Sequence, residues 1–201
     1  AMIPMNLMKN KKADYIVTGQ WAKKAAKEAE LYGEVNVVAS SADKTFSYIP
    51  DCSDLPIDDD ADYVYICENN TIYGTRFNEL PDTGNVPIIA DMSSFILSEP
   101  VDVSRYGMIY AGAQKNMGPA GLTVVIIRED LIGTAMEMTP TMFNYKTHAD
   151  NGSMYNTPPT YGIYILGLVL DWVKEQGGLS EMEKLNRKNC LLYTSDAADE
   201  L

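Results

Sequence analysis

The sequence has a single histidine, His148, and only three cysteines, Cys52, Cys67 and Cys190. The cysteines form no Cys-x-x-Cys pair and no Cys/His spacing of the kind that binds zinc, so the sequence predicts neither a metal site nor a disulfide framework. Unpaired cysteines fit a reducing compartment, and we expect a cytoplasmic protein. A catalytic centre built on histidine has one candidate, which lacks a neighbouring Asp/Ser arrangement.

Basic residues are scarce as well. Sixteen Lys and Arg face 28 Asp and Glu, which gives a net charge of −12 and argues against a nucleic acid or an anionic membrane surface as partner. The longest apolar run, residues 161–173, contains Asp171 and is too short to cross a bilayer. The apolar start of the chain is broken by Pro4 and Asn6, so we do not expect it to be a signal peptide. We expect a soluble protein that acts on small molecules.

Apolar runs alternate with helical segments along the chain. The runs that predict strands are residues 14–19, 35–39, 63–67, 87–91, 107–111 and 122–127. The segments that predict helices are residues 21–32, 161–176 and 180–189. Several strand runs are almost continuously apolar, which is typical of strands covered on both faces. The pattern therefore predicts an α/β fold, a mostly parallel sheet flanked by helices.

Three local features complete this prediction. We expect a short strand near residues 46–49, a short helix opening at 130–132 and irregular structure over 145–159. A large domain is expected over residues 1–176, and residues 177–189 are expected to begin the connection to a smaller C-terminal domain. Residues 190–201 continue no periodic pattern and are interpreted as a non-native tail. With the abrupt start at Ala1, the expectation is a fragment truncated at both ends.

Two charged residues stand where predicted strands end. Asp91 closes the run 87–91, and Lys115 follows the run 107–111 and precedes the turn Gly118-Pro119-Ala120-Gly121. The carboxyl ends of parallel strands line the ligand crevice of such sheets. A pyridoxal phosphate site needs this pair, because a lysine forms a Schiff base with the aldehyde and a carboxylate keeps the pyridine nitrogen protonated. The plainer alternative is a surface lysine in a turn and an aspartate that caps a helix.

Two further residues have a similar double interpretation. Trp21 follows the first predicted strand, where it could pack in the core or stack on a flat heteroaromatic ring. The segment Asn69-Asn70-Thr71 follows another strand and could be a simple turn, or its Thr71 could donate to the phenolic oxygen of a cofactor.

Five segments in order carry a resemblance to a known family. They are residues 21–25, 68–74, 90–94, 113–119 and 155–160, and the last contains Asn156-Thr157-Pro158-Pro159-Thr160. Together they resemble the phosphoserine aminotransferase family, which belongs to the class V pyridoxal phosphate-dependent aminotransferases of fold type I. The resemblance covers about residues 1–189.

The resemblance implies a role for each matching residue. Lys115 matches the catalytic Schiff-base lysine, Asp91 the partner of the pyridinium nitrogen, and Trp21 the ring-stacking aromatic. Thr71 matches the donor to the phenolic oxygen, and Gln114 matches a ligand of the cofactor phosphate. Asn156 and Thr157 match residues that reach the cofactor phosphate of the neighbouring subunit, which implies a homodimer with shared sites.

The reaction implied by the resemblance is part of serine biosynthesis. O-phospho-L-serine and 2-oxoglutarate exchange an amino group to give 3-phosphohydroxypyruvate and L-glutamate. The glycine-rich phosphate segment and the substrate-binding arginines of the family have no counterpart in this sequence, so the substrate follows from the resemblance alone. Two alternatives stay open, namely another class V aminotransferase of the alanine–glyoxylate type and an inactive α/β fragment.

Overall fold

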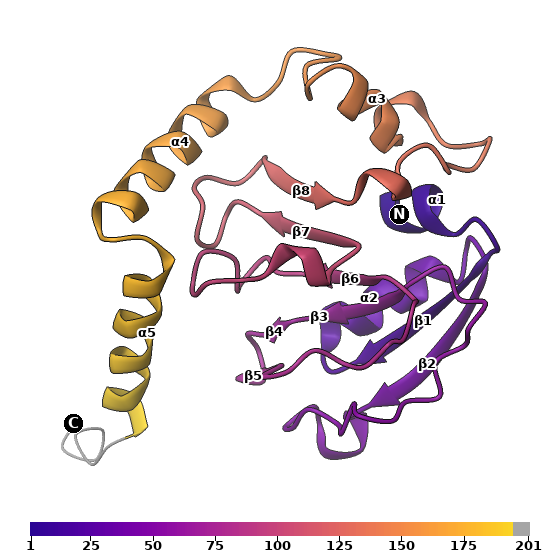
Figure 1. Ribbon diagram of the computed structural model, residues 1–201, viewed down its shortest axis with the longest axis horizontal. Helices are drawn as coiled ribbons and strands as arrows, with labels where there is room; N and C mark the ends of the chain where they lie inside the picture. The colour runs from indigo at the N-terminus through magenta and orange to yellow at the C-terminus, as the bar shows by residue number, and fades with distance from the viewer. Residues whose placement is uncertain (195–201) are drawn as a thin grey trace. The chain divides into compact units, whose positions relative to one another are not determined.

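The main sheet of the protein has six strands, in the order β2-β1-β3-β6-β7-β8 (Figure 1). The computed structural model describes the backbone of residues 1–194 and the side chains of residues 1–189. The strands of the sheet are β1 (Lys12–Val17), β2 (Glu34–Ser40), β3 (Val64–Cys67), β6 (Ile88–Asp91), β7 (Met108–Gly112) and β8 (Thr123–Ile127). A separate antiparallel pair consists of β4 (Asn69–Asn70) and β5 (Thr75–Arg76).

Five strands of the main sheet form parallel pairs, as the apolar runs predicted. β1 pairs in parallel with β2 and with β3, β3 pairs with β6, and β6 pairs with β7. β3 is buried along its whole length, which explains why its sequence shows no alternation of polar and apolar residues. The predicted α/β fold with a mostly parallel sheet and flanking helices is confirmed.

The helices are α1 (Met2–Leu7), α2 (Gln20–Ala29), α3 (Tyr145–Asp150), α4 (Thr160–Glu175) and α5 (Leu179–Thr194). α2 packs on β1, β2 and β3 through the buried alanines Ala22, Ala26 and Ala29. Their spacing of four and three residues places them on one face of the helix, while its lysines lie on the other. Among the described residues, no helix is long and apolar enough to cross a membrane.

The described chain divides into two compact units. Unit 1 consists of residues 1–92, 103–110 and 125–158, and unit 2 consists of residues 93–102, 111–124 and those from Pro159 onward. The core of unit 1 is rich in tyrosine, because Tyr15, Tyr63 and Tyr65 are each at most 1% exposed. The core of unit 2 includes Ala111, Ala113 and Met117, against which Leu166 of α4 packs.

Three local predictions were wrong or incomplete. Residues 46–49 form no strand, because Thr45 and Phe46 have φ angles of 54° and 60°, in the left-handed region, and this conformation breaks an extended segment. The stretch 145–159 is not wholly irregular, since it contains α3, whose first turn is capped by the Asn144 side chain. The helix expected at residues 130–132 is a 3₁₀ turn over Glu129–Leu131.

The C-terminal helices agree with the sequence to within a few residues. α4 ends before Gly177 and Gly178, whose φ angles of 98° and 81° close the helix as predicted. α5 continues through residues 190–194, and the rest of the predicted tail 190–201 lies outside the described residues. The division into a large domain 1–176, a connection 177–189 and a non-native tail stays a prediction.

Candidate functional site

Three strands of unit 1 end at one edge of the sheet and deliver polar residues there. β1, β3 and β6 are neighbouring parallel strands, so their carboxyl ends meet at the same edge. β1 is followed by Thr18 and Gly19, and β3 is followed by Glu68 and the short strand β4. β6 ends at Asp91 itself.

The turn between β1 and α2 is fixed by Asn70. The Asn70 side-chain amide donates to the Thr18 hydroxyl over 3.0 Å, and both residues are buried. A Cβ placed on Gly19 would lie 2.6 Å from Asn70 Oδ1, so only glycine fits this approach. Trp21 follows in the first turn of α2 and is 53% exposed, with the Lys24 ammonium 4.8 Å from the centre of its ring. The turn therefore presents a flat, accessible aromatic ring.

Asp91 is held by a tyrosine from the next strand. It is paired in register with Cys67 of β3 on one side and with Tyr110 of β7 on the other. The Tyr110 hydroxyl donates to Asp91 Oδ2 over 2.9 Å, and the hydroxyls of Tyr110 and Tyr65 are 2.8 Å apart. Burial raises the pKa of both phenols well above its ordinary value, so both stay protonated. Asp91 is half-buried at the strand end.

In unit 2, Lys115 lies on a turn whose two ends are tied down. The Ala113 carbonyl accepts from the N–H groups of Met117 and Gly118, over 3.1 and 2.8 Å, and the Ala113 N–H donates to the Leu122 carbonyl over 2.9 Å. Met117 is buried at 2% exposure and anchors the turn in the core of the unit. Lys115 itself is exposed, so the loop holds its backbone while the amine faces outward.

The same unit braces this loop from a second segment. The Gly112 N–H donates to the Ser93 hydroxyl over 3.1 Å, and the Asn116 side chain donates to the Ile96 carbonyl over 2.9 Å. Gly118, with a φ angle of 151°, needs a backbone conformation that side chains rarely allow. The residues on either side of Lys115 are therefore fixed by hydrogen bonds.

The other predicted site residues are all exposed. Thr71 directly follows Asn70 in the turn between β4 and β5, and Gln114 precedes Lys115 in its loop. Asn156 and Thr157 lie in the irregular stretch before α4. The structure thus brings Trp21, Thr71 and Asp91 to strand ends of unit 1, and Gln114 and Lys115 to one loop of unit 2. The role of each in binding a cofactor stays a prediction.

Two residues around this edge, Tyr65 and Tyr110, were not predicted as part of the site. The turn 69–71 was predicted to lie at a strand end, but the sequence does not indicate that the Asn70 side chain crosses to the end of β1. Tyr65 and Tyr110 lie inside apolar strand runs, where the polar end of the tyrosine is easily overlooked. Their shared feature is a buried hydroxyl, which needs a partner and therefore indicates a polar neighbour on the same face of the sheet.

The other reactive groups of unit 1 offer little for catalysis. The His148 Nε2 lies 2.8 Å from the Met142 carbonyl oxygen, so its ring is engaged with the backbone. Burial raises the pKa of the Cys67 thiol to about 12, which keeps it protonated near neutral pH. Among the described residues, no group of three or more His, Cys, Asp and Glu side chains could hold a metal ion.

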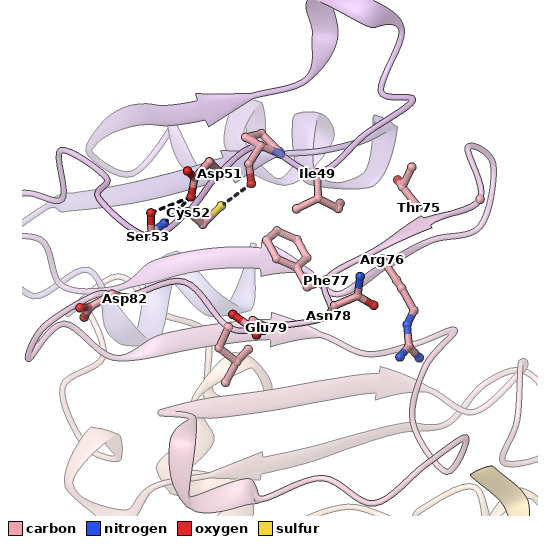
Figure 2. A pocket seen from close by; sticks show the side chains of 13 residues that line it. Ile49, Asp51, Cys52, Ser53, Thr75, Arg76, Phe77, Asn78, Glu79 and Asp82 are labelled. Atoms are coloured by element: carbon pink, nitrogen blue, oxygen red, sulfur yellow. Dashed lines mark hydrogen bonds between the residues drawn. The ribbon is translucent and has the colours of Figure 1, made fainter. Parts of the chain in front are cut away.

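A cavity of about 860 Å³ lies in unit 1 between residues 49–53 and 74–82 (Figure 2). Arg76 lines it together with the carboxylates of Asp51, Glu79 and Asp82, and none of the predicted cofactor residues does. The thiol of Cys52, which also lines the cavity, donates to the Pro50 carbonyl over 3.2 Å. The cavity is thus separate from the residues that the sequence selected.

Comparison with known proteins gives consistent matches. The family described as Aminotransferase class-V matches the chain over residues 1–194. A phosphoserine aminotransferase of Pseudomonas aeruginosa is 57% identical over 202 residues, which cover 99% of this chain and 56% of the relative. One of Bacillus cereus is 56% identical over 195 residues, which cover 96% of this chain and 54% of the relative.

The solved structures agree with these relatives. The crystal structure of pyridoxal phosphate-bound phosphoserine aminotransferase from Trichomonas vaginalis has a TM-score of 0.91 at 37% identity. The match covers all of this chain and 56% of that one. The chain therefore spans about half the length of the relatives that it matches.

Proposed function

Because the chain belongs to the class-V aminotransferase family, we propose that it is the cofactor-binding part of a pyridoxal phosphate-dependent transaminase. The observation that carries this proposal is the half-buried Asp91 carboxylate at the end of β6, with a hydroxyl donated to it by Tyr110. A carboxylate in this position suits a cationic ring nitrogen. Residues 1–176 would form most of the large domain, and residues 177–189 would begin the connection to a second one.

The residues present fit this cofactor by their chemistry. A planar ring needs a flat neighbour, and Trp21 is an accessible aromatic in the first turn of α2, the helix that follows β1. A basic ring nitrogen needs a carboxylate, and Asp91 ends β6 two strands away in the sheet. An aldehyde needs an amine, and Lys115 follows the neighbouring strand β7 by three residues in an anchored loop. The donor set of amine, carboxylate, aromatic ring and hydroxyl is the one that pyridoxal phosphate requires.

When bound, pyridoxal phosphate supplies an aldehyde for covalent attachment and a ring that withdraws electrons from the substrate α-carbon. Lys115 would attach to that aldehyde and, once released by the amino substrate, would carry the proton at the α-carbon. Asp91 would hold a proton on the ring nitrogen, because the positive charge at that atom helps the ring to withdraw electrons. Trp21 would cover one face of the ring and exclude water from it. Thr71 would donate its hydroxyl to the phenolic oxygen.

The phosphate would be held from two sides. Gln114 would donate its amide from the Lys115 loop, and Asn156 and Thr157 would reach the phosphate of a second copy of the chain. Both of the latter side chains are exposed, as such a role requires. The proposed assembly is therefore a homodimer with shared sites. We place it in the cytoplasm, because free Cys52 and Cys67 fit a reducing compartment.

For the substrates, we propose O-phospho-L-serine and 2-oxoglutarate, which give 3-phosphohydroxypyruvate and L-glutamate in serine biosynthesis. Support comes from relatives named phosphoserine aminotransferase at 56% and 57% identity. An alanine–glyoxylate aminotransferase from Nostoc has the same fold at 15% identity, so the alternative of the alanine–glyoxylate type is less favoured.

Substrate competition tests this proposal. The full-length gene product, loaded with pyridoxal phosphate, is given O-phospho-L-serine and 2-oxoglutarate with L-alanine and glyoxylate as competitors. We expect glutamate to form from phosphoserine and alanine to be used at a small fraction of that rate. Preference for alanine would refute the serine-pathway assignment. Absence of any transamination, with the protein folded, would refute the enzyme itself.

A further inference from the structure

Two tyrosines outside the predicted set form a hydrogen-bonded chain that ends on Asp91. The Tyr110 hydroxyl is 2.9 Å from Asp91 Oδ2, and the Tyr65 hydroxyl is 2.8 Å from that of Tyr110. The three residues come from β3, β7 and β6, which are adjacent in the sheet. Tyr110 and Asp91 are partners in the parallel register, so the contact is set by the strands themselves.

The hydrogen bonds of these three residues can run in only one direction, from Tyr65 through Tyr110 to Asp91. A carboxylate can only accept a hydrogen bond, so the single hydroxyl proton of Tyr110 is donated to Asp91. The Tyr110 oxygen then has only lone pairs to offer, and Tyr65 must be its donor. Burial, the largest cause, raises the pKa of both phenols, so neither loses its proton near neutral pH. Both hydroxyls therefore direct positive ends of O–H dipoles toward the carboxylate.

The Tyr65 end of the hydrogen-bonded chain is rigid. Tyr65 is 1% exposed, and its ring stacks on that of Tyr15 with centroids 4.9 Å apart and planes inclined by 25°. Its hydroxyl cannot turn to water, so it stays on Tyr110. Tyr15 makes a second, separate hydroxyl pair with Tyr63, also at 2.8 Å. That pair includes no carboxylate, which makes Tyr63 a matched control for a buried phenol.

We propose that Tyr110, supported by Tyr65, is a positioning residue that holds the Asp91 carboxylate in a fixed orientation toward the nitrogen of the bound pyridine ring, so that a proton stays on that nitrogen. The inference rests on the proposed role of Asp91 as partner of that nitrogen. Donation from Tyr110 to Oδ2 fixes the orientation of the Asp91 carboxylate. Loss of the donor would free the carboxylate to rotate, and its contact with the protonated ring nitrogen would weaken.

The test uses the full-length gene product loaded with ¹⁵N-labelled pyridoxal phosphate. In Tyr110→Phe, we expect the ring-nitrogen resonance to move toward the value of an unprotonated pyridine. We also expect the dissociation constant of pyridoxal phosphate to rise about tenfold. Tyr65→Phe should move the resonance in the same direction by a smaller amount. Tyr63→Phe, which removes an equally buried hydroxyl, should leave it where it is in the parent.

The Asp91→Asn variant separates the role of Asp91 at the ring nitrogen from the positioning role of Tyr110. If Asp91→Asn moves the ring resonance and Tyr110→Phe does not, the positioning role of Tyr110 is wrong and the role of Asp91 stands. If Asp91→Asn leaves the resonance unchanged, the proposed partner of the ring nitrogen is wrong, and the inference is overturned with it. Should Tyr110→Phe fail to fold, the Tyr65→Phe resonance decides, and an unshifted value there overturns the inference.

Discussion

The side-chain amide of Asn70 donates a 3.0 Å hydrogen bond to the hydroxyl of Thr18, across the gap between β4 and the end of β1. The same side chain lies so close to Gly19 that a Cβ there would be 2.6 Å from its oxygen. One amide thus fixes the turn from which Trp21 emerges. The Trp21 ring has its place because Asn70 holds the turn before it.

Substitution of Gly19 by alanine should destabilise the protein. The new methyl group forces the Asn70 side chain to turn, which breaks a buried hydrogen bond at a cost of about 1–3 kcal/mol. Urea unfolding followed by circular dichroism measures this change. Gly167→Ala on α4 is a control for the loss of a glycine, since a methyl group there would meet nothing within 4 Å and its φ is not left-handed. A midpoint for Gly19→Ala equal to that of the parent would show that Asn70 is not held as described.

Trp21 should matter more for cofactor binding than for stability. It is 53% exposed, so Trp21→Ala removes little buried area. Loss of ring stacking should raise the dissociation constant of pyridoxal phosphate by about 2- to 10-fold, while Trp21→Phe keeps a flat ring and loses less. Equilibrium titration of the apoprotein measures both variants. Leu31→Ala, at a position 74% exposed beyond the end of α2, is the control, and an equal loss there would count against stacking.

Cys67 should be almost unreactive in the native protein. Its side chain is 3% exposed, and burial, helped by the nearby charge of Asp91, raises its thiol pKa to about 12. Iodoacetamide at about pH 8 should leave it unlabelled in the native state and label it in urea, because only the thiolate reacts. Peptide mass spectrometry reads the site directly. Equal labelling rates with and without urea would contradict the buried position.

The protein should lose stability in alkali. Burial raises the pKa of several phenols above the ordinary value of 10.0; they are Tyr15, Tyr63, Tyr65, Tyr110 and Tyr145. Below pH 10.0 these phenols are protonated in both the folded and the unfolded state, and their full contribution to stability is present. Above that pH they ionise in the unfolded state first, which favours unfolding. The free energy of unfolding must therefore fall as the pH rises past 10.0. Urea midpoints from about pH 8 to about pH 11 measure the slope. Tyr63→Phe should make it shallower, and an unchanged slope would contradict the burial of Tyr63.

Much of the fold could be predicted from the sequence because its strands are buried on both faces. The run Tyr63 to Cys67 is apolar enough to predict a central strand, and the spacing of Ala22, Ala26 and Ala29 predicts the face of α2 that packs on the sheet. Turns were harder. No neighbouring residue in the sequence indicates the left-handed conformation of Phe46. The Phe46 ring packs instead against the distant Tyr73, with the two ring centroids 5.0 Å apart.

The candidate site also contains residues that the sequence could predict and residues that it could not. Asp91 and Lys115 follow predicted strands, so their position at strand ends could be read from the pattern. The hydroxyl chain from Tyr65 through Tyr110 could not, because it depends on which strands are neighbours in space. Sheet order is a property of the whole chain, and Asn70 reaches Thr18 over 52 residues for the same reason.

The most direct measurement is the site of covalent attachment. The full-length gene product is incubated with pyridoxal phosphate, reduced with borohydride and digested, and the modified peptide is identified by mass spectrometry. We predict one stoichiometric pyridoxyl group on Lys115, its loss in Lys115→Ala, and its retention in Lys174→Ala, a change of an exposed lysine on α4. A fully loaded protein with the group on another lysine, or with none on Lys115, would contradict the proposed function.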